Sequence, residues 1–410
     1  MSRIKDIKAR EILDSRAMPT VEVDVITESG VVGTFSVPSG ASTGSKEALE
    51  LRDKDERYKG KGVLKAVNNV NEIIKPALID MEVTDQLSID KKLLELDGTE
   101  NKTNLGANAI LGVSVACLKA AALENGKDVY DYLNKRDKKT PFAMFNIVNG
   151  GKHAFNNIDI QEFMIVPKFK SFKEIVRVAS EVFLSLKANL EKRGMSTAVG
   201  DEGGFAPNVE KNSEALDLIV EAITDAGYTP GKDVYIAMDI AASSFYDGES
   251  GVYRFEGNEL STEELLDYYK DIVKKYPIIS IEDPFDENDI EGFQMITATL
   301  GKHLMIVGDD LFVTNKKLLE KGIEGSWANA ILIKPNQIGT FYEMLETVAL
   351  ARKNGLNTIM SHRSGETTDT FIADAAVALD IPYIKTGSVT RGERVAKYNR
   401  LMRIEENINN

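Results

Sequence analysis

Six short apolar runs decide the fold of this chain: VYIAMD (234–239), IISIED (278–283), MIVGDD (305–310), AILIK (330–334), TIMSHR (358–363) and YIK (383–385). Each run is short and apolar enough to be a buried strand. Each ends in charged or strongly polar residues, which are costly to place inside a core. Successive runs end 23 to 43 residues apart, the length of a strand, a helix and two loops. We therefore predict consecutive βα units of a closed parallel barrel, with the strand ends meeting at one mouth.

The composition limits the class of protein. The chain has 410 residues, of which 43% are hydrophobic and 28% charged, as in globular proteins that are not embedded in a membrane. A formal net charge of −14 argues against a nucleic-acid or anionic-membrane surface. The N-terminus lacks a signal-like apolar stretch, and we expect no membrane span, so a cytoplasmic location is predicted. The single cysteine, Cys117, lies in an apolar helical stretch and is predicted to be a buried structural thiol.

Two domains are predicted. Residues 1–38 have the alternation and turn signals of three antiparallel strands. Helical periodicity follows from about Gly62 to Leu133, and a charged stretch that ends in proline separates it from the barrel. We assign residues 1–137 to a smaller α+β domain and residues 138–410 to the α/β barrel. The barrel opens with two apolar runs that have no helix between them, which indicates an antiparallel pair before regular βα alternation.

Three acids at successive strand ends, Asp239, Glu282 and Asp309, predict a metal site. Carboxylates brought together at one mouth repel each other, and a divalent cation removes that cost. A ligand set made only of oxygens favours a hard ion, Mg²⁺ or Mn²⁺. Alternatively, each acid separately caps a strand or pairs with a neighbouring lysine or arginine.

The following strand ends carry positive charge. Lys334 is a candidate general base, because a metal beside it would lower its pKa and favour the neutral amine. The alternative is an ion pair with one of the acids. Lys385, Arg363 and Ser364 form a corner suited to phosphate or carboxylate, unless these cations pair with Glu366 or Glu393.

Polar residues of the early barrel complete the candidate site. Glu162 and Glu202 would put carboxylates on the side opposite a lysine, which supplies an acid and a base on two faces of a substrate. His153 and His362 lie in polar strand-end loops, whereas His303 is assigned no role.

Motifs along almost the whole chain resemble the enolase family. The matching stretches, in order, are ILDSR and PTVEVDV (11–25), PSGASTG with EALELRD (38–53), GANAILGVS (106–114), NGGKHA and QEFM (149–164), GDEGGFAP (200–207), IEDPF (281–285), GDDLFVTN (308–315), LIKPNQIGT (332–340), SHRSGET (361–367), and IKTG with GER, KYN and LMRIEE (384–406). Each motif alone is weak, but this order is highly specific.

The resemblance implies a fold, a reaction and cofactors. The barrel would be of the ββαα(βα)6 type, and the protein would be a glycolytic lyase that reversibly dehydrates 2-phosphoglycerate to phosphoenolpyruvate. Two Mg²⁺ ions are implied, with Mn²⁺ as a substitute. One would be held by Asp239, Glu282 and Asp309, and the other would bridge the substrate phosphate and the loop at Ser42.

The resemblance also assigns roles. Lys334 would remove the C2 proton, and Glu202, supported by Glu162, would protonate the leaving hydroxyl. The substrate pocket would be completed by His153, Gln161, Ser42, His362, Arg363, Ser364 and Lys385. The implied assembly is a homodimer or an octamer built from dimers.

Four positions depart from the family pattern: Ala17 and Met18 replace a usual Gly-Asn pair, Ser244 stands where a Glu is usual, and Phe155 is unusually large. None of them is a proposed ligand, acid or base, so the departures bear on loop closure. Two other functions are considered: a related acid dehydratase of the same superfamily, and a binding or scaffold protein that keeps the fold without activity.

Overall fold

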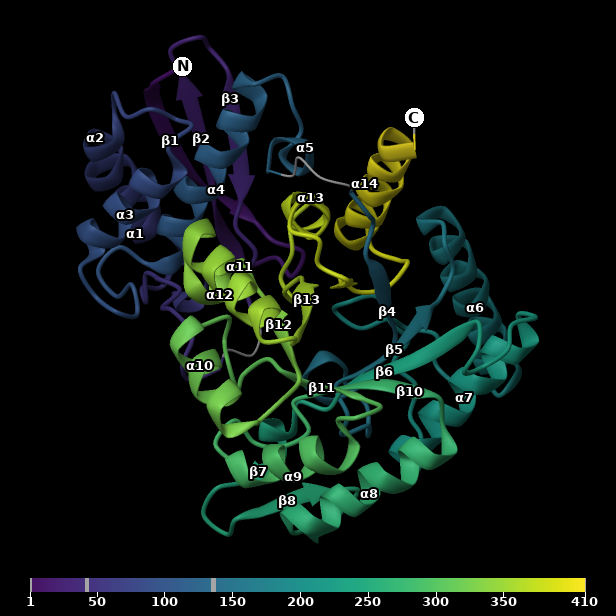
Figure 1. The fold of residues 1–410 in the computed structure, drawn as a ribbon. Coiled ribbons are helices and arrows are strands. Elements are labelled where there is room, and N and C mark those ends of the chain that lie inside the picture. The colour runs from purple at the N-terminus through teal and green to yellow at the C-terminus, as the bar shows by residue number, and fades with distance from the viewer. Residues whose placement is uncertain (1, 41–43, 134–137, 410) are drawn as a thin grey trace.

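The N-terminal part of the chain is a three-stranded antiparallel sheet covered by helices. The structure, a computed structural model, describes residues 2–40, 44–133 and 138–409. The sheet has the order β1 (Ile4–Leu13), β2 (Pro19–Thr27) and β3 (Val32–Ser36), as predicted (Figure 1). The helices that follow are η1 (Arg57–Gly60), α1 (Leu64–Asn68), η2 (Asn69–Ile74), α2 (Lys75–Leu78), α3 (Gln86–Asp97), α4 (Ala107–Glu124) and α5 (Val129–Leu133). Alternation along β2 buries Val21, Val23 and Val25 completely against these helices.

The remainder of the chain is a closed eight-stranded barrel with helices outside it. Strand neighbours run β10-β11-β12-β13-β14-β4-β5-β6. The strands are β4 (Phe142–Asn149), β5 (Glu162–Pro167), β6 (Val234–Asp239), β10 (Ile278–Glu282), β11 (Met305–Gly308), β12 (Ala330–Ile333), β13 (Asn357–Ser361) and β14 (Tyr383–Lys385). The helices are α6 (Phe172–Lys192), α7 (Asn212–Asp225), α8 (Thr262–Lys275), α9 (Ile290–Leu300), α10 (Lys316–Gly325), α11 (Pro335–Ile338), α12 (Phe341–Lys353), α13 (Phe371–Ala378) and α14 (Gly392–Asn409).

One barrel strand runs against the others, as predicted. β5 pairs antiparallel with both β4 and β6, whereas every other neighbouring pair in the barrel is parallel. With α6 and α7 after β5, the order is ββαα followed by six βα units. The reversal has a consequence for the site, because the mouth receives the amino end of β5 and the carboxyl ends of the other strands.

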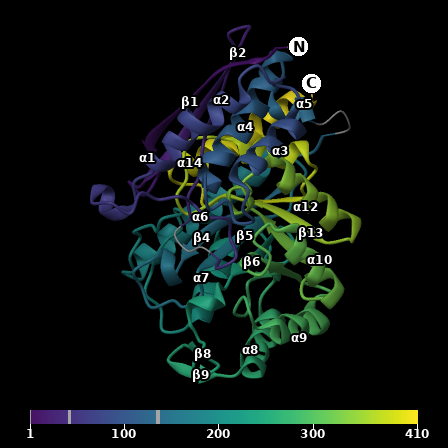
Figure 2. The ribbon, with the colours of Figure 1, turned by 90° about the vertical axis from the view of Figure 1, so that its left-hand side faces the viewer.

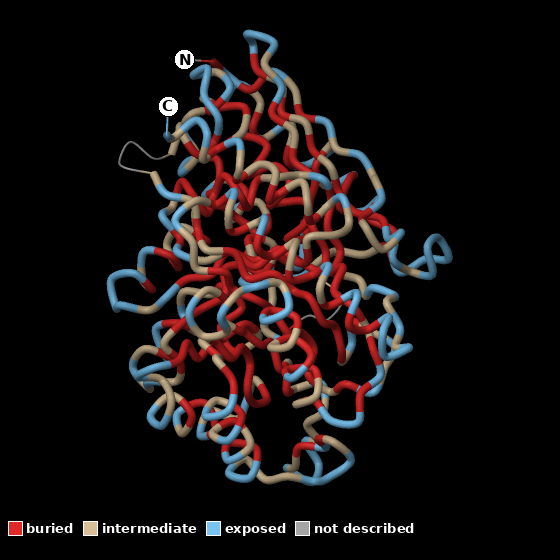
Figure 3. Tube along the Cα trace, turned by 90° about the vertical axis from the view of Figure 1, so that its right-hand side faces the viewer, coloured by how far each residue is buried: buried red, intermediate tan, exposed pale blue. Residues whose placement is uncertain are grey.

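The barrel interior is a core of its own. Inward-facing strand residues form a separate apolar cluster made of Met144, Met164, Val166, Ala237, Met305, Val307, Ala330, Leu332 and Ile359. Their strand neighbours pack outward against the helices, as the two-residue period requires. Figure 3 shows buried chain through the middle of the molecule, with the exposed segments at its edges. Both termini lie at the end of the molecule formed by the N-terminal sheet (Figure 2).

Three sequence expectations need correction or comment. The family resemblance implies that residues 243–258 form a loop that closes over the site, but they contain most of a small antiparallel sheet, β7 (Tyr246–Asp247), β8 (Val252–Phe255) and β9 (Asn258–Leu260), which follows η4 (Ala242–Ser244). The S-x-x-E pattern of Ser171 and Glu174 predicts a capping box at the start of α6. This prediction is wrong: within the described chain the Ser171 side chain caps nothing, and Glu405 of α14 instead accepts the N–H groups of Phe172 and Lys173. The same pattern predicts a capping box at Ser261 and Glu264, and this one is confirmed.

Helix α4 bears on the expectation that no segment spans a membrane. By length and composition it is long and apolar enough to cross one, and it is the one such helix among the described residues. However, 83% of its residues are buried inside the protein, where it packs on β2 and β3. Cys117 lies on this helix and is buried, as predicted.

Candidate active site

The predicted strand-end residues meet at one mouth of the barrel. Asp239 and Glu282 are the last residues of β6 and β10, and they are paired in register. Asp309, Lys334 and His362 directly follow β11, β12 and β13, and Lys385 ends β14. All of these residues except Glu282 line a polar cavity of about 40 Å³, whose full lining is His153, Gln161, Glu162, Glu202, Asp239, Ala241, Asp283, Asp309, Asp310, Lys334, Ser361, His362, Arg363, Ser364 and Lys385.

Lys385 joins the acids of three neighbouring strands. Its Nζ lies 2.9 Å from Asp239 Oδ2, 2.9 Å from Glu282 Oε1 and 3.2 Å from Glu162 Oε1. Burial opposes the ammonium, but Asp239, Glu162 and Glu282 together raise the pKa of Lys385 well above its usual value. Burial and the adjacent Asp239 carboxylate raise the pKa of Glu282 well above its usual range.

The charged side chains around Lys334 favour its protonated form. Burial favours its neutral form, but its hydrogen-bonded partner Asp309 outweighs burial, and the pKa of Lys334 is raised. The ion pair with an acid that the sequence left as an alternative is therefore present. A low pKa for Lys334 requires that the charge of Asp309 be compensated by another cation.

The donor set fits a hard divalent cation. Six carboxylates but only three permanent cations line the cavity. Burial together with Asp309 raises the pKa of the neighbouring Asp310 to about 7, which reflects this surplus of negative charge. Two buried oxygens, Gln161 Oε1 and Glu162 Oε2, have no hydrogen-bond partner among the described residues. Oxygen ligands in excess are the chemistry that Mg²⁺ and Mn²⁺ prefer. Ser42, the remaining predicted ligand, lies outside the described residues.

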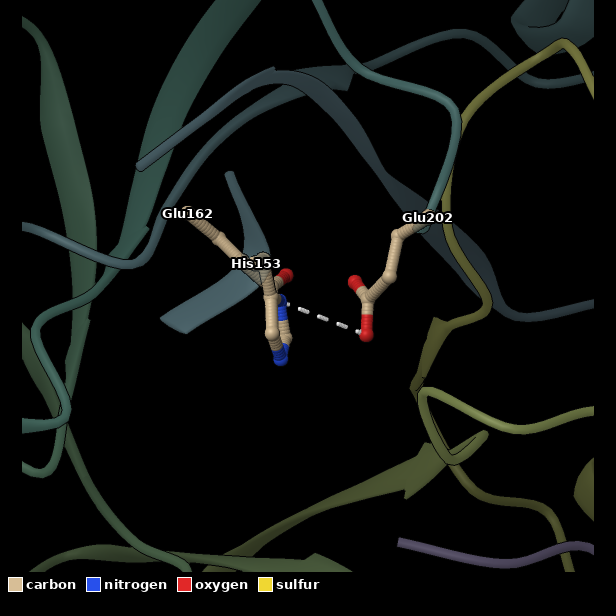
Figure 4. Close-up of side chains that lie close together, drawn as sticks. All are labelled: His153, Glu162 and Glu202. Carbon is tan, nitrogen blue, oxygen red and sulfur yellow. Dashed lines mark ion pairs between the residues drawn. The ribbon is translucent and has the colours of Figure 1, made fainter. Parts of the chain in front are cut away.

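A second group of acids faces Lys334 from across the barrel. Figure 4 shows His153 with Glu162 and Glu202, whose ligand atoms lie within 4.8 Å of one another. His153 Nδ1 is 3.6 Å from a carboxylate oxygen of each glutamate. His153 lies on the short turn η3 (Gly151–His153). Glu202 lies in a glycine-rich loop, where a Cβ on Gly200 would come within 2.6 Å of the His153 carbonyl oxygen. The glycine thus permits the two loops to approach.

The surroundings of the two glutamates shift their pKa values in opposite directions. Burial and the neighbouring carboxylates of Glu202 and Asp239 raise the pKa of Glu162 well above its usual range. Burial also acts to raise the pKa of Glu202, but His362, His153 and Arg394 outweigh it and hold that pKa below its usual range. Burial lowers the pKa of His362 to about 4, so at neutral pH His362 acts on Glu202 through an N–H dipole. Arg394 is the neighbour of Glu202 in this group that carries a permanent positive charge.

Two residues of the cationic corner, Arg363 and Ser364, form hydrogen bonds with side chains of the N-terminal domain. Arg363 donates to both carboxylate oxygens of Glu47, at 2.9 and 3.2 Å. Arg16 donates to Ser364 Oγ at 3.1 Å. The sequence alternatives for these cations named the wrong acids, since Glu366 pairs with Lys397 and Glu393 with Arg391.

Three residues of the site were given no role from the sequence. Besides Glu47 and Arg394, Asp283 accepts the backbone N–H groups of Asp309 and Asp310, both at 2.9 Å. Asp283 itself has a left-handed φ of 41°. The EALELRD, IEDPF and GER motifs that contain these residues were noted, but no spacing rule distinguishes them from surface charges.

Comparison with protein-family models covers nearly the whole chain. The model described as "Enolase, N-terminal domain" matches residues 4–133, and "Enolase, C-terminal TIM barrel domain" matches residues 105–410. The chain belongs to the enolase family. Its barrel and its small α+β domain are those of the family, and the predicted family and fold class are confirmed. The boundary placed near residue 138 stays a prediction.

The departures of this enolase-family chain lie beside the site and outside its cavity lining. Ala17 has a left-handed φ of 58° in an exposed turn, and Met18 beside it is also exposed. Phe155 is fully exposed on the segment that follows His153. Ser244 ends the short turn η4.

Proposed function

We propose that this protein reversibly dehydrates 2-phosphoglycerate to phosphoenolpyruvate. The observation that carries the proposal is the placement of base and acid. Lys334 follows β12 and Glu162 begins β5, and these strands are four apart in the ring of eight, directly across the barrel. Glu202 stands with Glu162. A small anion between them would meet an amine on one face and a carboxyl pair on the other, as removal of a proton and of a hydroxyl from neighbouring carbons requires.

The positive charges of the mouth bind the substrate's anionic groups in this proposal. Arg363 and Lys385 are buried, fixed by carboxylates, and adjacent to the cavity. Charges that are fixed before the substrate arrives need little reorganisation during the reaction, which is the main source of electrostatic catalysis. The remaining pocket residues, Gln161, His153, His362 and Ser364, offer polar atoms to the same space.

Mg²⁺ bound by Asp239, Glu282 and Asp309 would supply positive charge that stabilises the carbanion next to the substrate carboxylate and favours the neutral amine of Lys334. Lys334 then takes the proton from C2. Burial and the neighbouring carboxylate of Glu202 raise the pKa of Glu162 and so favour its protonated form. Glu162 can pass that proton to Glu202, which delivers it to the departing 3-hydroxyl.

The reaction is tested by following the absorbance of phosphoenolpyruvate formed from 2-phosphoglycerate, with and without EDTA. We expect turnover that EDTA abolishes and added Mg²⁺ restores. Absence of a metal-dependent signal would exclude this reaction, leaving a related acid dehydratase or a non-catalytic scaffold as the function.

The division of roles is tested by isotope exchange in D₂O. Glu202→Gln should still exchange the C2 proton of the substrate while failing to dehydrate it, because Lys334 remains. Lys334→Ala should lose both activities. Exchange that persists in Lys334→Ala would show that the base is another residue.

We also propose that the protein acts in the cytoplasm and forms at least a homodimer, either as such or as an octamer of dimers. The sequence resemblance is the support for this assembly. A mass measurement in solution tests it, and a monomer would contradict it.

A further inference from the structure

Arg394 is a buried cation directly behind the proposed acid. It lies on α14 and its side chain is completely buried. The guanidinium donates to the carbonyl oxygens of Arg363 and Ser364, both at 2.6 Å, and to that of Asp201 at 3.2 Å. One side chain therefore joins the anion-binding segment to the loop that carries Glu202.

The same guanidinium determines where His362 carries its proton. Arg394 Nη1 lies 2.6 Å from His362 Nδ1. An arginine side chain can only donate hydrogen bonds, so Nδ1 must present its lone pair. The proton of the neutral imidazole is then on Nε2, which lies 3.3 Å from Glu202 Oε2. A second proton on Nδ1 would point an N–H group of His362 at an N–H group of Arg394, and it would place two positively charged side chains in contact.

We propose that Arg394 is a positioning residue that fixes His362 as the neutral Nε2–H tautomer and so directs an N–H group at Glu202. The tautomer follows from the geometry alone, whereas its effect on rate rests on the proposed function. The charged groups that face His362 are Arg394 from α14, Glu202 from the neighbouring loop and Glu366 from its own segment. Of these, only Arg394 contacts Nδ1.

The assignment gives His362 one role and excludes another. Asn146 Nδ2 donates to Glu202 Oε2 at 3.1 Å. His362 Nε2 lies 3.3 Å from the same oxygen and has no other partner among the described residues, so its N–H group is directed at Glu202 without completing a hydrogen bond of good geometry. A histidine locked in this way orients the carboxylate, but it does not relay protons as an imidazolium. Gly387 permits the arrangement: its φ is 76°, and a Cβ there would lie 2.8 Å from Arg394 Cδ.

The tautomer can be observed in the unmodified protein. The chain has only three histidines, so long-range ¹H–¹⁵N spectra of histidine-labelled protein contain three imidazoles, and His362→Gln identifies one of them. We expect a neutral Nε2–H pattern for His362 across about pH 5–8, the range in which ordinary histidines titrate. An Nδ1–H pattern, or titration within this range, would overturn the proposal.

Variants of Arg394 distinguish a role in positioning His362 from a general contribution to the folded structure. Arg394→Met should release Nδ1, so that His362 shows mixed tautomers or titrates, and kcat should fall by about 10²-fold or more with a smaller change in KM. Arg394→Lys keeps one donor and should restore the Nε2–H pattern, with partial activity. Arg400→Met, on the same helix but paired with Asp374, should leave the His362 signals unchanged.

An unchanged His362 spectrum in folded Arg394→Met would contradict the inference. If wild-type protein shows the expected tautomer but no dehydration, the proposed function fails and the tautomer assignment stands.

Discussion

Ala17 has a backbone conformation that its side chain does not favour. A left-handed φ of 58° costs a residue with a Cβ about 1–2 kcal/mol and glycine almost nothing. Glycine costs more entropy on folding, which offsets part of that difference. We therefore expect Ala17→Gly to raise the free energy of unfolding by about 0.5–1 kcal/mol, measured by urea denaturation. Ala226→Gly is the matched control, because Ala226 has an ordinary φ of −75° and should lose stability on the same change.

Residue positions could be predicted where the local pattern restricts them. An apolar run that ends in an acid or a lysine places that side chain at the mouth. Asp239 and Lys385 line the cavity there, and Glu282 lies directly beside them, paired with Lys385. Glu47 and Arg394 could not be found in this way. Their roles depend on Arg363 and His362, which are more than 30 residues away in the chain. The partner of a charge is decided by the packing of distant elements, and no local spacing encodes it.

At the scale of elements, the start of α12 is held by the other domain. The N–H of Phe341 donates to Ser114 Oγ at 3.0 Å, and the N–H of Tyr342 donates to Asp90 Oδ2 at 2.9 Å. Both acceptors lie on helices of the N-terminal domain, α4 and α3. Removal of a buried acceptor costs about 1–3 kcal/mol. We expect Asp90→Ala to lower the free energy of unfolding by that amount, measured by thermal or urea denaturation.

The same carboxyl predicts a dependence of stability on pH. Burial raises the pKa of Asp90 from 3.8 to about 6, although Ser114, Tyr342 and Gln86 hydrogen-bond to it. The folded protein thus binds this proton more tightly than the unfolded chain. Its contribution to stability is complete below pH 3.8 and is lost as the pH rises through 6, by about 2–3 kcal/mol. Asp90→Asn lacks this titration, so it should gain stability relative to wild type between about pH 4 and 7. A pH-independent difference between the two proteins would refute the shift.

Most elements could be predicted because each long strand or helix carries its own period. The antiparallel start of the barrel was recognisable from two apolar runs without a helix between them. The strands β7, β8 and β9 have only two to four residues each, which is too short for alternation to stand out from a loop. The start of α6 was misassigned because its capping acid, Glu405, lies 233 residues away from Phe172.

At the scale of the whole molecule, both domains contribute residues to the candidate site. Ser39 exchanges two backbone hydrogen bonds with Gly365, at 2.8 and 2.9 Å, which attaches the base of the PSGASTG segment to the barrel next to Ser364. Glu47 and Arg16 reach the same segment from the N-terminal domain. The barrel pattern in the sequence predicted a mouth, and the family resemblance predicted that the N-terminal domain completes it. Neither gave these contacts, because a domain interface has no sequence period of its own.

The surplus of acids at this mouth predicts that a divalent cation stabilises the whole protein. An ion that binds only the folded state adds about 2.7 kcal/mol when its concentration is 100 times its Kd. We therefore expect Mg²⁺ to raise the melting temperature of the EDTA-treated protein, without any substrate present. Glu282→Gln removes one negative ligand and should lose most of this rise. Asp374→Asn removes a buried acid that pairs with Arg400 far from the mouth, so it should melt lower but respond fully to Mg²⁺. An equal response of Glu282→Gln and wild type would place the cation elsewhere, because the ligand set proposed here cannot lose a carboxylate without losing affinity.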